Sequence, residues 1–230
     1  MNKTDKETKE RHDKIWREFL QHPEVYVFPG RIAVPPAVSA MLVFQVPVAD
    51  AAMRASLAGL VARLEKAGCL FPFPQDYWHA TVVPPTLLTK GQPSPPNLYG
   101  EEFIEHAVSK AREVLGGYPP FQVTVEGVNA FKDVVVAIPY DGGHFAQLNV
   151  RLRSALPELP ARYLDGHDPI PHISLAQYTK RGDLEDLIAA LGELRDHELG
   201  TFTVSGIEML VLPIDDGRPG TPHKYPIAFL

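Results

Sequence analysis

The sequence has almost no cysteine and no long apolar run. Cys69 is the single cysteine among 230 residues, which excludes an internal disulfide framework and fits a reducing compartment, so we expect a cytoplasmic protein. No stretch approaches 18 consecutive apolar residues, and a transmembrane helix is therefore excluded. The charged N-terminal segment MNKTDKETKERHDKIW has no apolar core, and we do not expect it to act as a secretory signal.

Positive charge and metal-binding motifs are also scarce. The chain holds 22 Lys and Arg against 28 Asp and Glu, for a formal net charge of −6. Because affinity for long nucleic acids depends on Lys and Arg, we expect no long nucleic-acid partner, and no membrane partner either. A local site for a small phosphate group remains compatible with this charge. Neither a His-Glu-x-x-His sequence nor a paired-cysteine motif occurs, so no metal or other cofactor is expected.

Proline is abundant, and the apolar content is that of a globular protein. The 23 prolines predict rigid loops, chiefly over 23–39 and 84–100, while 45% hydrophobic residues suffice for a core. Apolar periodicity predicts helices over 1–20, 51–67, 101–115, 144–156 and 183–195, the last capped by Asp183. It predicts strands over 41–48, 77–83, 121–128, 133–140, 169–178, 201–213 and 224–230.

The two halves of the chain repeat one pattern. Each half reads as a buried strand, a helix and then a strand that contains His-x-Thr or His-x-Ser. From Val43 to His79 is 36 residues, and from Val135 to His172 is 37. A repeat of this kind predicts an α+β fold of two similar lobes over 40–230, preceded by a helical and loop extension over 1–39.

The repeated motif pairs an imidazole with a hydroxyl. The two copies are HATV at 79–82 and HISL at 172–175. Because alternate side chains of a strand share a face, His79 lies beside Thr81, and His172 beside Ser174. Two histidines near neutral pH can serve as base and acid, and two hydroxyls can stabilise phosphorane-like charge, which is the chemistry that opens a phosphodiester.

Other interpretations stay open at this stage. Both histidines fit a structural role in which a neighbouring hydroxyl satisfies a buried ring. Tyr178 falls on the face of His172 and Ser174 if the strand is regular, where it either borders a substrate or packs at the core edge. Lys180 and Arg181 either meet a phosphate or lie in a solvated turn. His167 lies near the second motif in a loop of Gly, Asp and Pro residues, and we interpret it as structural or exposed. No partner pattern accompanies the other histidines, which are His12, His22, His106, His144, His197 and His223.

On the two motifs, their spacing and the repeat, the chain resembles the 2H phosphoesterases, which include 2′,5′ RNA ligase-like proteins and cyclic nucleotide phosphodiesterases. The resemblance covers about 40–230. It implies two pseudo-two-fold lobes of antiparallel sheet with flanking helices and an active cleft between the sheets. It also implies His79 and His172 as metal-independent acid and base, with Thr81 and Ser174 as phosphate-binding residues.

The chain departs from the RNA-acting members of that family. Many of those carry Arg or Lys shortly after a motif, whereas here Val83-Pro84-Pro85 and Ala176-Gln177-Tyr178 follow. We therefore expect a monomeric phosphoric diester hydrolase that cleaves a cyclic or 2′-linked phosphodiester in a small nucleotide or RNA end. The alternatives are RNA 2′,5′ ligation or RNA end processing, and a nucleotide-binding module without catalysis.

Overall fold

The computed structural model describes residues 2–30, 32, 34–90, 98–163, 166–180 and 184–229. Its helices are α1 Lys3–Gln21, α2 Ala51–Leu64, α3 Phe103–Leu115, α4 His144–Ala155 and α5 Glu185–Leu194. Its strands are β1 Val38–Pro47, β2 Leu70–Pro72, β3 His79–Thr89, β4 Leu98–Gly100, β5 Phe121–Ala130, β6 Val134–Tyr140, β7 Ile173–Tyr178, β8 Glu198–Val204, β9 Gly206–Asp215, β10 Arg218–Pro219 and β11 His223–Ala228. Short 3₁₀ turns cover Glu65–Ala67 and Gln75–Tyr77.

Local signals in the sequence define several helix ends. The side chain of Asn2 accepts a hydrogen bond from the amide of Asp5 at 2.9 Å and so caps α1. Asp50 caps α2 in the same way, through the amide of Met53 at 2.7 Å. After α2, the 3₁₀ turn ends at Gly68, whose φ of +68° is the left-handed conformation that favours glycine.

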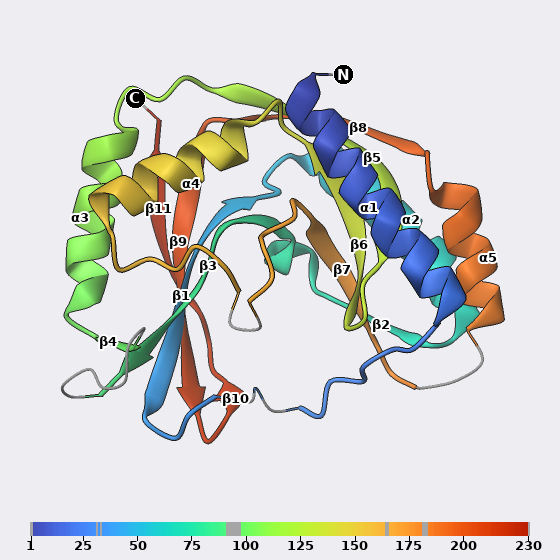
Figure 1. The fold of residues 1–230 in the computed structure, drawn as a ribbon, viewed down its shortest axis with the longest axis horizontal. Helices are drawn as coiled ribbons and strands as arrows, with labels where there is room; N and C mark the ends of the chain where they lie inside the picture. The colour runs from blue at the N-terminus through green and yellow to red at the C-terminus, as the bar shows by residue number, and fades with distance from the viewer. Residues whose placement is uncertain are drawn as a thin grey trace.

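The strands form one curled sheet (Figure 1), in the order β10-β9-β1-β3-β7-β6-β5-β8, while β11 pairs with β9, β2 with β7 and β4 with β3. Every pairing between these strands is antiparallel except that of β3 with β4. The α+β fold of two antiparallel lobes is confirmed. The two lobes join where Ala80 of β3 pairs with Ile173 of β7.

The sheet order is symmetric about that junction. Outward from the junction, β3, β1 and β9 on one side correspond to β7, β6 and β5 on the other. Val46 of β1 pairs with Ala80, and Ala137 of β6 pairs with Ile173, so the registers correspond as well. The repeat seen in the sequence is therefore a pseudo-two-fold repeat in space.

The connecting helices interlock the two lobes. Helix α2 follows β1 in the chain but packs against β7 and β8 of the other lobe. Likewise, α4 follows β6 but packs against β3 of the first lobe. One contiguous core of buried residues then runs through both lobes, from Leu42 and Phe44 to Ile173 and Leu175. This exchange of helices makes the two lobes one packing unit.

Helix α1 lies on the opposite face of the sheet from α2 and α5. It crosses in front of β5 and β6 (Figure 1). Val128 and Ala130 of β5 belong to the main core, whereas the alternating residue Asn129 faces α1 and is fully buried by it. Asn129 pairs with Val136, and Val136 pairs with Ser174, so α1 covers the face that carries Ser174.

Three sequence-based boundaries are wrong. Within the expected loop over 84–100, β3 continues to Thr89 because Pro84 and Pro85 fall in a bulge between the pairs Phe44–Val83 and Leu42–Thr86, and β4 covers Leu98–Gly100, while 91–97 lie outside the described residues. The expected strand 201–213 is two strands that meet at Ser205. The expected strand 169–178 is regular only from Ile173. Asp183, the expected cap of α5, lies outside the described residues.

Gly127 provides a test of how the lobe around β5 is built. Its φ is +80°, and a Cβ at this position would collide with the carbonyl oxygen of Arg195. We expect Gly127→Ala to lower the free energy of unfolding by about 2 kcal/mol or more. Gly59→Ala, in α2 with open space around it, should instead raise it by roughly 0.5–1 kcal/mol. Urea denaturation measures both, and equal stability of Gly127→Ala and the wild type would contradict the prediction.

Candidate active site

The junction between β3 and β7 brings the two His-x-Thr/Ser motifs together. Ala80 and Ile173 pair and point into the core, with 2% and 0% of their surface exposed. Their sequence neighbours therefore point to the other face. Continuing the antiparallel register by one residue in each direction sets His79 on the side of Ser174 and Thr81 on the side of His172, and the charge of His172 acts on the His79 ring.

The four side chains form a small polar surface with internal two-fold symmetry. The axis through the Ala80–Ile173 pair relates His79 to His172 and Thr81 to Ser174. All four side chains are half-buried. Each imidazole thus has a hydroxyl beside it on its own strand and a second hydroxyl across the junction.

Both rings are oriented by the backbone two residues earlier. Nδ1 of His79 lies 2.6 Å from the carbonyl oxygen of Tyr77, and Nδ1 of His172 lies 2.7 Å from that of Ile170. A carbonyl oxygen only accepts, so each Nδ1 carries the proton and donates. Nε2 is then the basic nitrogen of the neutral ring, and it points away from the backbone that holds Nδ1.

Each ring also packs against the edge or face of an aromatic side chain. Tyr77 and His79 are T-shaped at 5.1 Å between ring centroids, and Phe131 and His172 are T-shaped at 5.0 Å. The hydrogen bond and the aromatic contact together restrict both torsions of each histidine. The arrangement holds two basic nitrogens in fixed directions.

The electrostatic surroundings of the two rings differ. Burial lowers the pKa of His79 from 6.5 to about 4, and the charges of His172 and Lys224 add to that lowering against the hydrogen bond to Tyr77. Burial also lowers the pKa of His172, but the hydrogen bond to Ile170 and the negative charge of Asp133 oppose it. Of the two, His172 has the surroundings that favour its protonated form.

Tyr178 does not lie where regular alternation predicts. Val136 pairs with Ser174 and Val135 with Ala176, so β7 contains a bulge that reverses the alternation. Tyr178 is consequently 1% exposed in the core, and its hydroxyl donates to the carbonyl oxygen of Phe131 at 3.0 Å. Lys180 is exposed beyond the strand, and Arg181 lies outside the described residues.

A polar row that the sequence analysis missed extends from Thr81 across the first lobe. Gln45 pairs with both Thr81 and Glu208, and its amide donates to Oε1 of Glu208 at 2.6 Å. Lys224 of β11 lies 3.6 Å from Glu208 and donates to the carbonyl oxygen of Asp76 at 3.2 Å. Period-two alternation in the strands that carry Gln45 and Glu208 is the signal that marks them as facing His79's side of the sheet.

The buried polar face of α1, which includes His12, is a second feature that the sequence did not reveal. It is fully buried, and its Nε2 lies 2.9 Å from the carbonyl oxygen of Pro171, next to His172. The buried positions of α1 are Asp5, Thr8, His12 and Phe19. Their spacing of three, four and seven residues is that of one helix face, which an analysis of apolar residues alone overlooks because three of the four are polar.

Within the part of the chain that the structure describes, no three His, Cys, Asp or Glu side chains gather as they would to hold a metal ion. Over the same residues, no helix is long and apolar enough to cross a membrane.

The comparisons with known proteins agree with this fold. The model of the 2′-5′ RNA ligase superfamily matches residues 54–213, which is more than half of the chain. The chain therefore belongs to the 2′-5′ RNA ligase superfamily, the 2H phosphoesterases, as the resemblance implied. A search of curated proteins finds no match.

Solved structures share the fold at low sequence identity. TT0787 of Thermus thermophilus has a TM-score of 0.59 and 17% identity, over 82% of this chain and 98% of that one. A phosphoesterase has a TM-score of 0.54 and 17% identity over the same shares. Escherichia coli LigT, in its complex with ATP, has a TM-score of 0.52 and 18% identity over 83% and 99%.

The buried His12 predicts a pH dependence of stability. Its pKa is 6.5 in an unfolded chain and about 4 in the folded protein, with burial as the main cause. The unfolded state therefore binds the proton first as pH falls, so the free energy of unfolding decreases between about pH 6.5 and pH 4, by roughly 3 kcal/mol from this group. Urea denaturation across this range should give a shallower pH dependence for His12→Gln. An identical dependence in the variant and the wild type would contradict the prediction.

Proposed function

We propose that this protein is a metal-independent phosphodiesterase that opens a cyclic or 2′-linked phosphodiester in a small nucleotide or at an RNA end. The observation that carries the proposal is the β3–β7 register, which sets two imidazoles and two hydroxyls around one point of the sheet. Membership of the superfamily supports phosphoester chemistry of this kind.

In the proposed reaction one histidine acts as base and the other as acid. Nε2 of the base removes a proton from the attacking water while its oxygen bonds to phosphorus. Nε2–H of the acid gives its proton to the ribose oxygen as the phosphorus–oxygen bond breaks. Thr81 and Ser174 donate hydrogen bonds to the non-bridging oxygens, whose charge grows in the transition state.

We assign His79 as the base and His172 as the acid. Lys224 disfavours a proton on His79, whereas Asp133 favours one on His172. A bound phosphate adds negative charge beside both rings and raises their pKa values, and His172 is the ring better placed to hold the proton. Different surroundings of two like groups are the usual way in which acid and base roles are divided.

A small substrate suits the charge around the site better than a long RNA. The chain has a net charge of −6, and the residues after the two motifs are Val83 and Ala176 rather than Arg or Lys. Lys224 supplies a single positive charge next to His79. We expect a monomer that binds one nucleotide or one RNA end, with Lys224 near its phosphate.

Ligation is the second candidate function. The description of the family as a 2′-5′ RNA ligase superfamily favours it. In the reverse of 2′–5′ cleavage, a 5′ hydroxyl loses its proton to the base and bonds to the phosphorus of a 2′,3′-cyclic phosphate, while the bond from phosphorus to the 3′ oxygen breaks and the acid protonates that oxygen. The two directions differ in their salt dependence, since ligation of RNA chains requires contacts with many phosphates and loses affinity steeply as salt rises.

A substrate panel tests the proposal. We expect turnover of 2′,3′-cyclic, 3′,5′-cyclic or 2′–5′-linked nucleotides in the presence of EDTA, with His79→Ala and His172→Ala each reducing kcat by about 10²–10⁴-fold. His106→Ala, on the exposed side of α3, is the matched control and should retain wild-type turnover. Circular dichroism checks that each variant folds. Loss of activity with EDTA, or binding of the panel without product, would overturn the proposal.

The assignment of acid and base predicts a bell-shaped pH profile of kcat/KM, in which the acidic limb follows the pKa of His79 and the alkaline limb follows the pKa of His172. Lys224→Met should raise the pKa of His79 and move the acidic limb to higher pH. Asp133→Asn should lower the pKa of His172 and move the alkaline limb to lower pH. Both groups are partly or wholly exposed, so shifts of about a few tenths of a pH unit are expected. Asp215→Asn, at the exposed end of β9, is the remote control. If Lys224→Met moved the alkaline limb and Asp133→Asn the acidic limb, the two roles would be exchanged.

A further inference from the structure

The segment that leads into His172 has few backbone donors of its own. Residues 168–172 belong to no strand, and Pro169 and Pro171 have no N–H. Such a segment is held chiefly through its carbonyl oxygens. One of them, that of Ile170, accepts the hydrogen bond from Nδ1 of His172 and so sets the direction of the ring.

Helix α1 binds the carbonyl groups on both sides of Ile170. Arg11 donates from Nη1 to the carbonyl oxygen of Pro169 at 2.9 Å and from Nη2 to that of Asp168 at 3.1 Å. His12 donates from Nε2 to the carbonyl oxygen of Pro171 at 2.9 Å. The carbonyl groups of the residues before and after Ile170 are therefore both held, and with them the position of the Ile170 carbonyl that orients His172.

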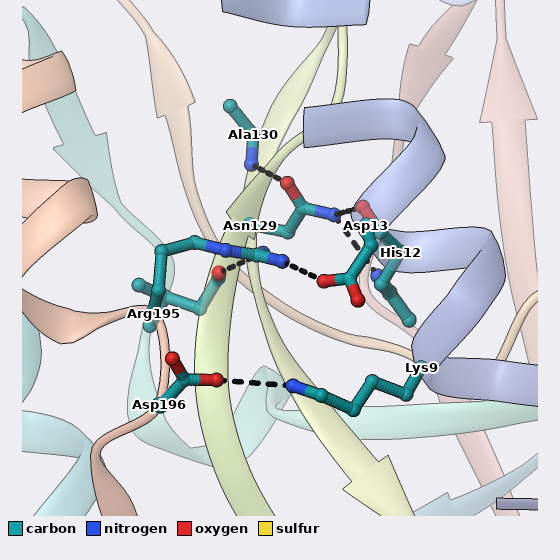
Figure 2. A network of polar contacts seen from close by, with 8 residues as sticks. Lys9, His12, Asp13, Asn129, Ala130, Arg195 and Asp196 are labelled. Carbon is teal, nitrogen blue, oxygen red and sulfur yellow. Dashed lines mark hydrogen bonds and ion pairs between the residues drawn. The ribbon is translucent and has the colours of Figure 1, made fainter. Parts of the chain in front are cut away.

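His12 is itself held in one tautomer. The side-chain amide of Asn129 donates to Nδ1 of His12 at 3.1 Å and to its backbone carbonyl at 2.8 Å (Figure 2). Because Nδ1 accepts, the proton of the neutral ring is on Nε2, which donates to Pro171. The amide of Ala130 fixes Asn129 in turn, through Oδ1 at 2.9 Å.

Figure 2 shows that α1 is also joined to the chain that follows α5. Lys9 donates to Asp196 at 3.0 Å, and Arg195 donates to Asp13 at 2.5 Å and to the carbonyl oxygen of Val128 at 2.8 Å. These contacts join α1 to the chain after α5. The helix is thereby fixed relative to the sheet and can hold the segment 168–171 in place.

In the other lobe, the segment before His79 receives the corresponding hydrogen bonds from different groups. Before His79, the carbonyl oxygen of Trp78 accepts from the amide of Val48 at 2.9 Å, and that of Asp76 accepts from Lys224. These carbonyls stand one and three residues before the histidine, as those of Pro171 and Pro169 do. Continuing the β6–β7 register by two residues makes Pro139 the equivalent of Val48, and Pro139 has no N–H to donate.

We propose that α1 is a positioning element for the second catalytic motif: His12 provides the hydrogen bond to Pro171 that Pro139 cannot donate, and Arg11 holds Pro169 as Lys224 holds Asp76, so that together they orient His172. The inference rests on the proposed function for its catalytic consequence. It concerns a helix outside the part of the chain that matches the family model, which begins at residue 54.

The test compares three variants of the full chain. His12→Leu keeps the volume but removes both ring nitrogens, and kcat should fall at least tenfold with a much smaller change in KM. His12→Gln keeps an N–H donor near the position of Nε2, and it should retain kcat within about threefold of the wild type. Lys14→Met removes an exposed lysine of α1 whose ion pair with Glu18 lies within the helix, and it is the matched control, with wild-type kcat expected.

A second readout does not depend on turnover. The ¹⁵N chemical shifts of His172 should report a single tautomer with the proton on Nδ1 in the wild type and in His12→Gln, and a mixture in His12→Leu. If His12→Leu does not fold, Arg11→Met makes the same test, since Arg11 is half-exposed and releases Pro169 and Asp168 only.

The outcomes separate this proposal from the proposed function. A wild-type protein that turns over no member of the panel defeats the proposed function, while the tautomer of His172 still tests the positioning. If His12→Leu folds and leaves both the His172 tautomer and kcat unchanged, the positioning role is overturned. If His12→Leu does not fold, the same result in Arg11→Met overturns it. Equal losses in His12→Leu and His12→Gln would also overturn it, because they would show a packing effect rather than a hydrogen bond.

Discussion

The antiparallel contact between Ala80 and Ile173 is the constraint on which the site depends. These two side chains turn into the core, and strand alternation then places their four polar neighbours on the opposite face. A slip of one residue in either strand would bury the imidazoles and expose the apolar residues, so the hydrophobic effect and the geometry of the site enforce the same register.

The two halves of the site are alike in sequence and differ in their surroundings. Each histidine donates from Nδ1 to the carbonyl two residues earlier, but His79 has Lys224 nearby and His172 has Asp133. The segment before His79 is a 3₁₀ turn held by β1 and β11, whereas the segment before His172 is held by α1. A symmetric pair of motifs thereby becomes an asymmetric pair of reactive groups, which acid–base chemistry requires.

Helix α1 is integrated into the fold by polar contacts rather than by a broad apolar face. Asp5 accepts from the amide of Gly142 at 3.1 Å, and His12 joins the helix to Asn129 and Pro171. Buried polar groups of this kind are costly unless every one is paired, and so they specify one docking position. Helix α1, the helical part of the segment treated from sequence as an extension over 1–39, thus packs on the sheet.

The sequence by itself determined the elements whose signals are local: the five helices marked by apolar periodicity, the repeated strand–helix–strand pattern, and the pairing of each histidine with a hydroxyl on one strand face. Tertiary structure alone decided the bulge that buries Tyr178, the passage of β3 through Pro84 and Pro85, and the contact of His12 with Pro171. The physical reason is the distance along the chain between the residues that interact. A cap or an alternation is fixed by residues a few positions apart, whereas a bulge or a docking contact is fixed by partners on other strands and helices, whose identity no local pattern encodes.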